Sequence, residues 1–297
     1  IWISRRDHQL TYASVSILID MAIKKQLTAY LPLYEGKAIH EYDTKYSEPK
    51  YYIELFQGLQ NLRSKRISSI KNPKIAFRAL GQSGNERNCI AAVLPEGCFT
   101  GNSLYYSVYN KAGLGVAEIL LFQSIFTSFI IDFLIRQKID KNLRLPFLNT
   151  LPVPRIQGNS GYEKIFYSIV ARSARLSCVS AEFKSIWENV FTVSWQSRTL
   201  WYPSSTSIAT YGPAHEQDIR RRLAEEAAKL TTEWSPTCGV HDRTPNRRDI
   251  GDRAQLRAEI DAYVAHLYGL TRDEFAHILD TFPVLKRKEE QAFGEFM

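Results

Sequence analysis

One apolar run, residues 112–135, places the strongest constraint on the fold, because about 20 such residues can cross a bilayer. The run nevertheless contains Glu118 and Asp132, which a membrane interior accepts only at a high free-energy cost. Polar residues recur every four positions and form one stripe on a helix: Ser124, Ser128, Asp132 and Arg136. We therefore expect a long, buried amphipathic helix over residues 114–138 and no membrane span.

Short strand-forming runs precede this helix, and helical patterns follow it. The strand-like runs are bounded by Gly, Asn, Ser and Pro, and they cover residues 30–34, 74–80, 89–94 and 103–109. Apolar residues recur at helical spacing over residues 162–176, 215–230 and 253–268. The sequence thus predicts an α+β chain, with a mixed sheet and the long buried helix in residues 1–157 and a mainly helical region in residues 158–297.

The helical region ends with recognisable boundary signals. Gly269 suits the end of one helix, and Thr271 with Glu274 predicts a capping box at the start of the next. That helix should bury Phe275, Ile278 and Leu279 and end at Pro283. Between the two regions, Pro152 and Pro154 argue against a helix in residues 145–154 and favour an extended segment.

The positive charge is concentrated in one stretch. The chain has 297 residues, a formal net charge of +7 and a pI near 9.1. Residues 63–78 contain no acid, and their cations are Arg63, Lys65, Arg66, Lys71, Lys74 and Arg78. Lys and Arg suit phosphate oxygens, and Arg, Asn and Gln suit base edges. The stretch is therefore either a DNA-contact segment or a solvated basic loop.

Catalytic and metal-binding motifs give no comparable signal. The chain has no Pro-Pro for a methyltransferase base-holding tetrapeptide, and Gly113 with Gly115 is an isolated Gly-x-Gly. Cys238 and His241 lack the second close pair that a zinc site needs. We expect no catalytic residue, no metal site and no cofactor in this chain. Four cysteines without a Cys-x-x-Cys pair fit a reducing cytoplasm, and the missing initiator Met suggests a piece of a longer protein.

Several segments together resemble one family. Residues 31–43 contain a Tyr-x-Gly-Lys turn followed by a His, aromatic and Asp step, carried by Tyr34, Gly36, Lys37, His40, Tyr42 and Asp43. Residues 74–104, 129–154 and 256–296 follow in order. The set resembles the target-recognition region of N6-adenine DNA methyltransferases of the single-chain restriction–modification and phage-defence type.

The resemblance implies a division of labour within a larger parent protein. Such a parent transfers a methyl group from S-adenosylmethionine to an adenine N6, and this region selects the DNA sequence. The catalytic methyltransferase domain and its cofactor loop are absent from the chain. Double-stranded DNA and the methyltransferase domain are the partners that the resemblance implies.

We expect the strand-rich half to lie along the major groove, where each base pair has a distinct donor and acceptor pattern. Arg78 and Arg87 are the candidates to read guanine, and Lys37, Lys71 and Lys74 to hold phosphates. The remaining candidate contacts are Arg63, Lys65, Arg66, Asn85 and Asn102. Residues 85–87 could instead simply close a hairpin, and residues 36–37 could be a structural turn.

Two other functions stay open. A metal-dependent nuclease could use Asp43, Glu48 and Lys50, which loosely match an acidic pair followed by a lysine. Alternatively, the chain could be a docking scaffold of a defence complex, with an incidental basic face.

Overall fold

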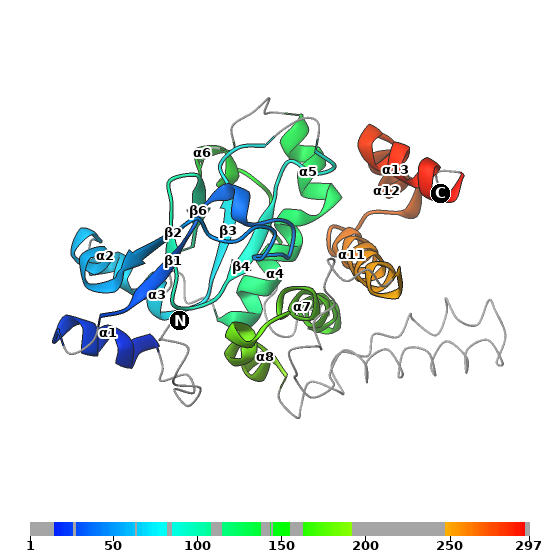
Figure 1. Cartoon of the computed structure of the whole chain (residues 1–297). Helices are drawn as coiled ribbons and strands as arrows, with labels where there is room; N and C mark the ends of the chain where they lie inside the picture. Colours follow the sequence, from blue (N-terminus) through cyan, green and yellow to red (C-terminus); the bar gives the residue numbers. More distant parts are fainter. Residues whose placement is uncertain are drawn as a thin grey trace. The chain divides into compact units, whose positions relative to one another are not determined.

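A computed structural model describes residues 15–25, 28–62, 64–81, 85–107, 115–137, 143, 145–154, 163–191 and 247–294 (Figure 1). The chain divides into two compact units. The first comprises Ile1–Ile119 and Leu134–Leu151, and the second comprises Leu120–Phe133 and Pro152–Met297. The described strands all belong to the first unit, so the architecture is α+β. The predicted division after residue 157 falls in residues 155–162, outside the described residues.

The first sheet is mixed. It contains β1 (Tyr30–Tyr34), β2 (Tyr51–Glu54) and β5 (Phe99–Thr100), in the order β2-β1-β5. β1 pairs with β2 in antiparallel and with β5 in parallel fashion. Because side chains alternate along a strand, the register sorts them into two faces. Those of Leu31, Leu33, Ile53 and Phe99 share one face, and those of Tyr30, Pro32, Tyr52 and Thr100 share the other.

Three helices cover the apolar face of this sheet. They are α1 (Val15–Ile23), α2 (Leu55–Asn61) and α3 (Ser64–Lys71), and their apolar residues form one core with Leu31 and Phe99. The Glu54 carboxylate caps α2 by accepting from the amides of Phe56 (3.0 Å) and Gln57 (2.8 Å). A larger residue at position 58 would collide with Phe99, because its Cβ would lie 2.2 Å from Phe99 Cζ.

The second sheet is antiparallel, with β3 (Lys74–Arg78) between β4 (Ala91–Leu94) and β6 (Leu104–Tyr106). These strands fall within three predicted runs, and β1 matches the fourth, so those predictions are confirmed. β2 and β5 were not predicted. A second core joins this sheet to the turn after β1 and includes Tyr34, Ile39, Leu94 and Leu104.

The described part of the apolar run, residues 115–135, is largely buried but is not one helix. It forms α4 (Val116–Thr127) and α5 (Phe129–Arg136), which are bent by 53° at Ser128. The hydroxyls of Thr127 and Ser128 donate to main-chain carbonyls of the preceding turn, Gln123 O (2.8 Å) and Ile125 O (2.7 Å), and so compete with the helical pattern. Ser128 Oγ also accepts from the Ile131 amide at 3.3 Å, which starts α5.

Ser124, Ser128 and Asp132 of the polar stripe are fully buried. Within the described residues no single helix has the length and hydropathy to cross a membrane, although α4 and α5 pass that test as a bent pair.

The break is tied to a distant helix of the second unit. The amide of Phe129 donates to Asp261 Oδ1 at 3.1 Å, and Asp261 lies buried on α11 (Arg247–Leu267). The Phe129 ring also packs edge-on against Phe282, with centroids 4.8 Å apart. A buried backbone amide that has no carbonyl partner within its own helix needs another acceptor, and Asp261 supplies one for Phe129.

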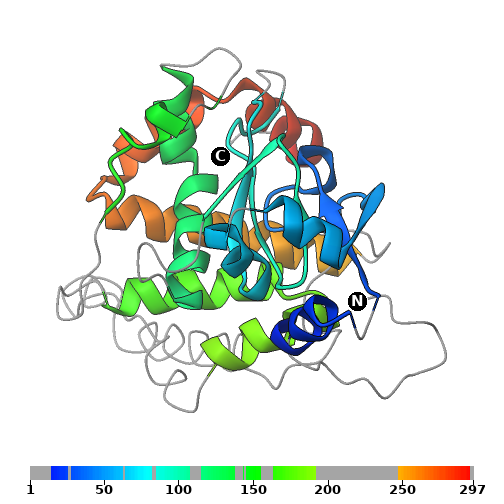
Figure 2. The ribbon, with the colours of Figure 1, turned by 90° about the vertical axis from the view of Figure 1, so that its left-hand side faces the viewer.

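Buried polar bonds connect the helices of the second unit. Gln123 Nε2 donates to Ser173 Oγ (3.2 Å) and Ser177 Oγ (2.8 Å) on α7 (Glu163–Ser177). α7 and α11 lie side by side (Figure 2), and the Arg172 guanidinium of α7 reaches Glu259 of α11 at 2.7 Å. A short helix, α8 (Lys184–Val190), follows α7. The unit is therefore held by specific polar contacts as well as by apolar packing.

The boundary signals are largely confirmed. Gly269 adopts φ +68°, and Thr271 with Glu274 forms a capping box at α12 (Arg272–Asp280). Ile278 is buried, while Phe275 and Leu279 are half-buried. Pro283 starts a further helix, α13 (Pro283–Phe293), which was not predicted. The predicted helix over residues 215–230 lies outside the described residues.

The extended segment predicted for residues 145–154 is partly wrong. It begins with a short helix, α6 (Leu145–Leu148), because Pro146 lies in the first turn, where the missing amide is tolerated. Only the part that contains Pro152 and Pro154 is irregular.

The Asp261 contact gives a stability prediction. Asp261→Ala leaves the Phe129 amide buried without this acceptor, so the free energy of unfolding should fall by about 1–3 kcal/mol. Asp261→Asn keeps an accepting oxygen, so its free energy of unfolding should fall by less than that of Asp261→Ala. Urea unfolding of the two variants measures the difference. Asp280→Ala, at an exposed position of α12, is the control; an Asp261→Ala effect no larger than this control's would contradict the role of the contact.

Candidate nucleic-acid interface

Three segments far apart in sequence meet at one edge of the first unit, which we call the turn site: residues 35–38, Arg78 and residues 101–103. The Gly36 amide donates to Ser103 Oγ at 2.9 Å. The Gly101 amide donates to Tyr34 O at 2.8 Å, and the Ala79 amide donates to Ser103 O at 3.0 Å. The turn after β1, the end of β3 and the β5–β6 turn are therefore joined by two backbone–backbone hydrogen bonds and one bond from a backbone amide to the Ser103 hydroxyl.

Gly36 is closely packed at the centre of the turn site. A Cβ on Gly36 would lie 3.2 Å from Ser103 O and 3.7 Å from Arg78 Cγ. The Arg78 Nε and Nη2 atoms both donate to Ile39 O, at 3.1 and 2.5 Å. One edge of the guanidinium thus fixes the turn, and only the other edge remains for a base. Burial lowers the pKa of Arg78, and the charges of Tyr46 and Glu41 oppose that shift.

An aromatic stack extends the turn site. The Arg78 guanidinium carbon lies 5.9 Å from the Tyr46 ring centroid, and the rings of His40 and Tyr46 are 4.7 Å apart. Ser47 Oγ donates to Lys37 O at 3.0 Å and holds this loop against the turn. Tyr46 is 52% exposed, so its ring is available to a ligand. Neither Tyr46 nor Ser103 was a predicted contact, and no motif in the sequence marks Tyr46.

The turn site presents two of the predicted contacts to solvent. The Lys37 side chain is 64% exposed and lies 3.6 Å from Glu35 Oε2. Asn102 is exposed at the tip of the β5–β6 turn. Together with Arg78, they offer an ammonium, a carboxamide and part of a guanidinium on neighbouring turns.

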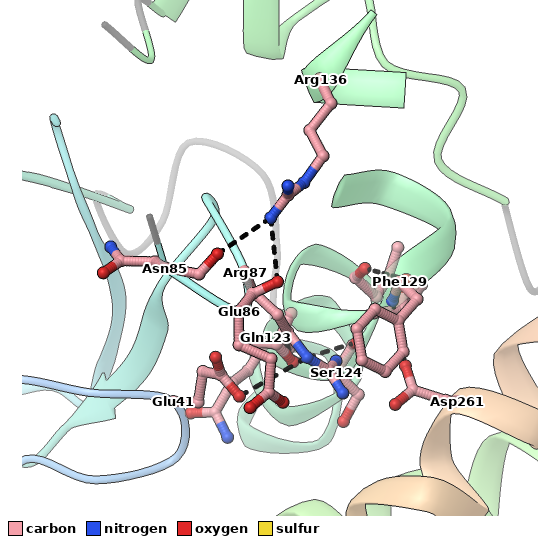
Figure 3. Close-up of polar contacts among 12 residues, drawn as sticks. Glu41, Asn85, Glu86, Arg87, Gln123, Ser124, Phe129, Arg136 and Asp261 are labelled. Carbon is pink, nitrogen blue, oxygen red and sulfur yellow. Dashed lines mark hydrogen bonds and ion pairs between the residues drawn. The ribbon is translucent and has the colours of Figure 1, made fainter. Parts of the chain in front are cut away.

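Two other predicted contacts are buried in the protein. Lys74 is 1% exposed, and its ammonium donates to Ser69 O (2.5 Å) and Cys98 O (2.9 Å). Arg87 is 4% exposed, and its Nε lies 3.6 Å from the buried carboxylate of Glu41 (Figure 3). The Lys74 ammonium and the Arg87 guanidinium are therefore too deeply buried to contact a phosphate or a base. We therefore withdraw Lys74 as a phosphate contact and Arg87 as a guanine reader.

The remaining predicted residues lie elsewhere. The carbonyls of Asn85 and Glu86 accept from Arg136 Nη2, at 3.1 and 2.9 Å (Figure 3), so this turn is fixed to α5. Lys71 is half-buried and lies 3.9 Å from Asp20. Arg63 lies outside the described residues, as do the side chains of Lys65 and Arg66, whose backbone belongs to α3. The basic stretch is therefore largely a helix and a strand, and not a loop.

The described residues bring together no metal site or activated nucleophile. No group of three or more His, Cys, Asp or Glu that could hold a metal occurs in the described part of the chain. Burial raises the pKa of the Cys178 thiol, which keeps it protonated. Asp43 Oδ1 accepts from the Lys45 amide at 2.7 Å, as in an ordinary turn.

The isolated Gly-x-Gly is only partly described. Gly113 lies outside the described residues. Gly115 directly precedes α4, where a Cβ would lie 2.7 Å from Glu118 Oε2. The carboxylate of the helix's own first turn therefore covers this end of α4, which leaves it unsuited to an anionic cofactor group.

Comparisons with known proteins identify no relative: no family model, no curated protein and no solved structure matches the chain. The geometry of the turn site is therefore the basis for a functional proposal.

The buried ion pair gives a second prediction. Glu41→Ala removes the buried carboxylate that lies 3.6 Å from Arg87 Nε, so the free energy of unfolding should fall by up to about 3–5 kcal/mol. The double variant Glu41→Ala/Arg87→Met removes both charges and should recover part of that loss. Lys37→Ala should change stability by less than about 0.5 kcal/mol, because Lys37 is a surface residue. Thermal and urea unfolding compare the three variants. If Glu41→Ala lowered the free energy of unfolding no more than Lys37→Ala does, the buried ion pair would be contradicted, and Arg87 would again be a candidate DNA contact.

Proposed function

We propose that the first unit reads a DNA sequence through the turn site. The observation that carries the proposal is the meeting of Lys37, Arg78 and Asn102 on neighbouring turns, although they come from separate parts of the sequence. The hydrogen bonds of these backbone amides hold the backbone of the three residues at a fixed spacing. A fixed spacing is what a reader of base edges needs, since a loose site pays for ordering on binding.

Each side chain has a distinct role in the proposal. Asn102 is exposed, and a carboxamide can bond an adenine through N6 and N7. Lys37 is an exposed point charge suited to a phosphate. Arg78 chiefly positions the turn through Ile39 O, and its free edge can contact a base. The contact set is thus smaller than the sequence predicted.

The proposed biological setting is an adenine-N6 DNA methyltransferase of a restriction–modification or phage-defence system. In that setting the methyltransferase domain of the parent protein binds S-adenosylmethionine and flips the adenine out of the duplex. This chain supplies the choice of sequence. The proposal of this setting rests on the resemblance of the segments at residues 31–43 and 74–104, which include the turn site.

Selection from a random duplex DNA pool tests the proposal. A recurring motif that persists at near-physiological salt is the expected result for a sequence reader. Binding that yields no motif and disappears with salt would reduce the activity to phosphate attraction, and the docking-scaffold function would then be favoured.

Variants at the turn site sharpen the test. Asn102→Ala should relax one base position of the motif at a loss of about 1–3 kcal/mol in binding. Lys37→Ala should weaken binding evenly across sequences and reduce the salt slope by about 1. Lys184→Ala, an exposed lysine on α8, is the matched control and should leave both properties unchanged. An Asn102→Ala variant that keeps the full motif would contradict the base-reading role.

A further inference from the structure

The turn site includes one acid, Glu35. It directly follows Tyr34, the last residue of β1. Tyr34 O accepts from the Gly101 amide at 2.8 Å, and a Cβ on Gly101 would lie 3.5 Å from Glu35 Cγ. The Glu35 side chain therefore lies against residue 101, directly beside the turn that carries the proposed base reader Asn102.

The fold does not account for this carboxylate. Glu54 caps α2 by accepting from two amides, and Glu41 lies in a buried ion pair. Glu35 also precedes a helical turn, residues 36–38, but its side chain makes no capping bond. Among the described residues, its carboxylate makes one polar contact, with the Lys37 ammonium 3.6 Å from Oε2, and its side chain is 31% exposed. An exposed ion pair of this kind contributes little to stability.

A carboxylate in a DNA site is unfavourable unless a base supplies a hydrogen-bond donor, because like charges repel it from the phosphates. An ionised carboxylate accepts hydrogen bonds and donates none. In the major groove the base donors are the exocyclic amino groups, N4 of cytosine and N6 of adenine, whereas thymine O4 and guanine O6 are acceptors. The Lys37 ammonium beside Glu35 offsets the negative charge toward the phosphates.

We propose that Glu35 is a further specificity residue of the turn site, whose carboxylate accepts a hydrogen bond from the exocyclic amino group of a base. The inference rests on the proposed function and names the chemistry that the turn site selects. Cytosine or adenine is accepted at the base position that faces Glu35, and thymine or guanine is rejected there, because each would place an oxygen against an oxygen.

Charge compensation is the competing role for Glu35. If the carboxylate serves only to offset the charge of Lys37, its removal strengthens the attraction to phosphates and should tighten binding to every sequence alike. A base contact gives a different result, because its removal relaxes one position of the motif and leaves the other positions as they were. The two roles are therefore separable by experiment.

Selection from a random duplex DNA pool by the unchanged chain and by Glu35→Gln tests the proposal. The variant keeps the shape of the side chain but adds a donor, so the preference for cytosine or adenine at one position should fall by about five- to tenfold. Glu188→Gln on α8 is the matched control, because Glu188 is 62% exposed and lies 3.5 Å from a lysine ammonium, that of Lys184. It should leave the motif unchanged.

Base analogues that lack only the amino group give a second readout at the assigned position. 2-Pyrimidinone replaces cytosine, and purine replaces adenine, so the analogue that binds more weakly also identifies which base is read. The analogue should weaken binding of the unchanged chain by about five- to tenfold and that of Glu35→Ala by less than about twofold, because the variant has already lost the contact.

The outcomes separate this inference from the proposed function. A motif that Glu35→Gln leaves intact, an equal gain in affinity for all sequences, or an analogue effect that persists in Glu35→Ala would overturn the role of Glu35 alone. The absence of any motif with the unchanged chain would overturn the proposed function, and the role of Glu35 with it.

Discussion

The break at Ser128 is the constraint on which the second unit depends. An apolar segment leaves its backbone without solvent partners, so each amide released at a bend needs an acceptor within the protein. Asp261 provides it for Phe129. Because Asp261 lies on α11, the bend and α11 fix one another, and α11 in turn holds α7 through the pair between Glu259 and Arg172. The bend, α11 and α7 are thus linked in series by two polar contacts on α11, of which the one through Glu259 is only partly buried.

In the first unit, buried cations play the corresponding part. Lys74 begins β3, the central strand of its sheet, and its ammonium donates to one carbonyl of α3, Ser69 O, and to Cys98 O directly before β5. Arg87 fixes the segment before β4 to Glu41 in the loop after β1. These residues have the chemistry of phosphate ligands, yet their charges are used to join segments of the same chain. Charge type alone therefore says little about where a cation lies.

Local patterns in the sequence located four strands and the main helices of the second unit, but not the helices α1, α2 and α3 that cover the first sheet, and not the bend between α4 and α5. Alternation and turn residues located β1, β3, β4 and β6, because these strands are framed by Gly, Asn, Ser and Pro. The bend at Ser128 was missed, since the four-residue polar repeat continues unchanged through it. At the candidate site, Lys37 and Asn102 were found as exposed turn residues. Lys74 was misassigned because its burial involves a hydrogen bond to Cys98 O, 24 residues away in the sequence, which local patterns do not contain.

The position of the turn site depends on the register of β1, because the turn site begins directly after Tyr34, the last residue of that strand. The two faces of β1 pack into separate cores: Leu31 belongs to one core and Tyr34 to the other. The strand therefore cannot slip by one residue without exchanging these side chains between the cores. This constraint fixes the place at which β1 ends and therefore the position of the turn that is proposed to read a duplex.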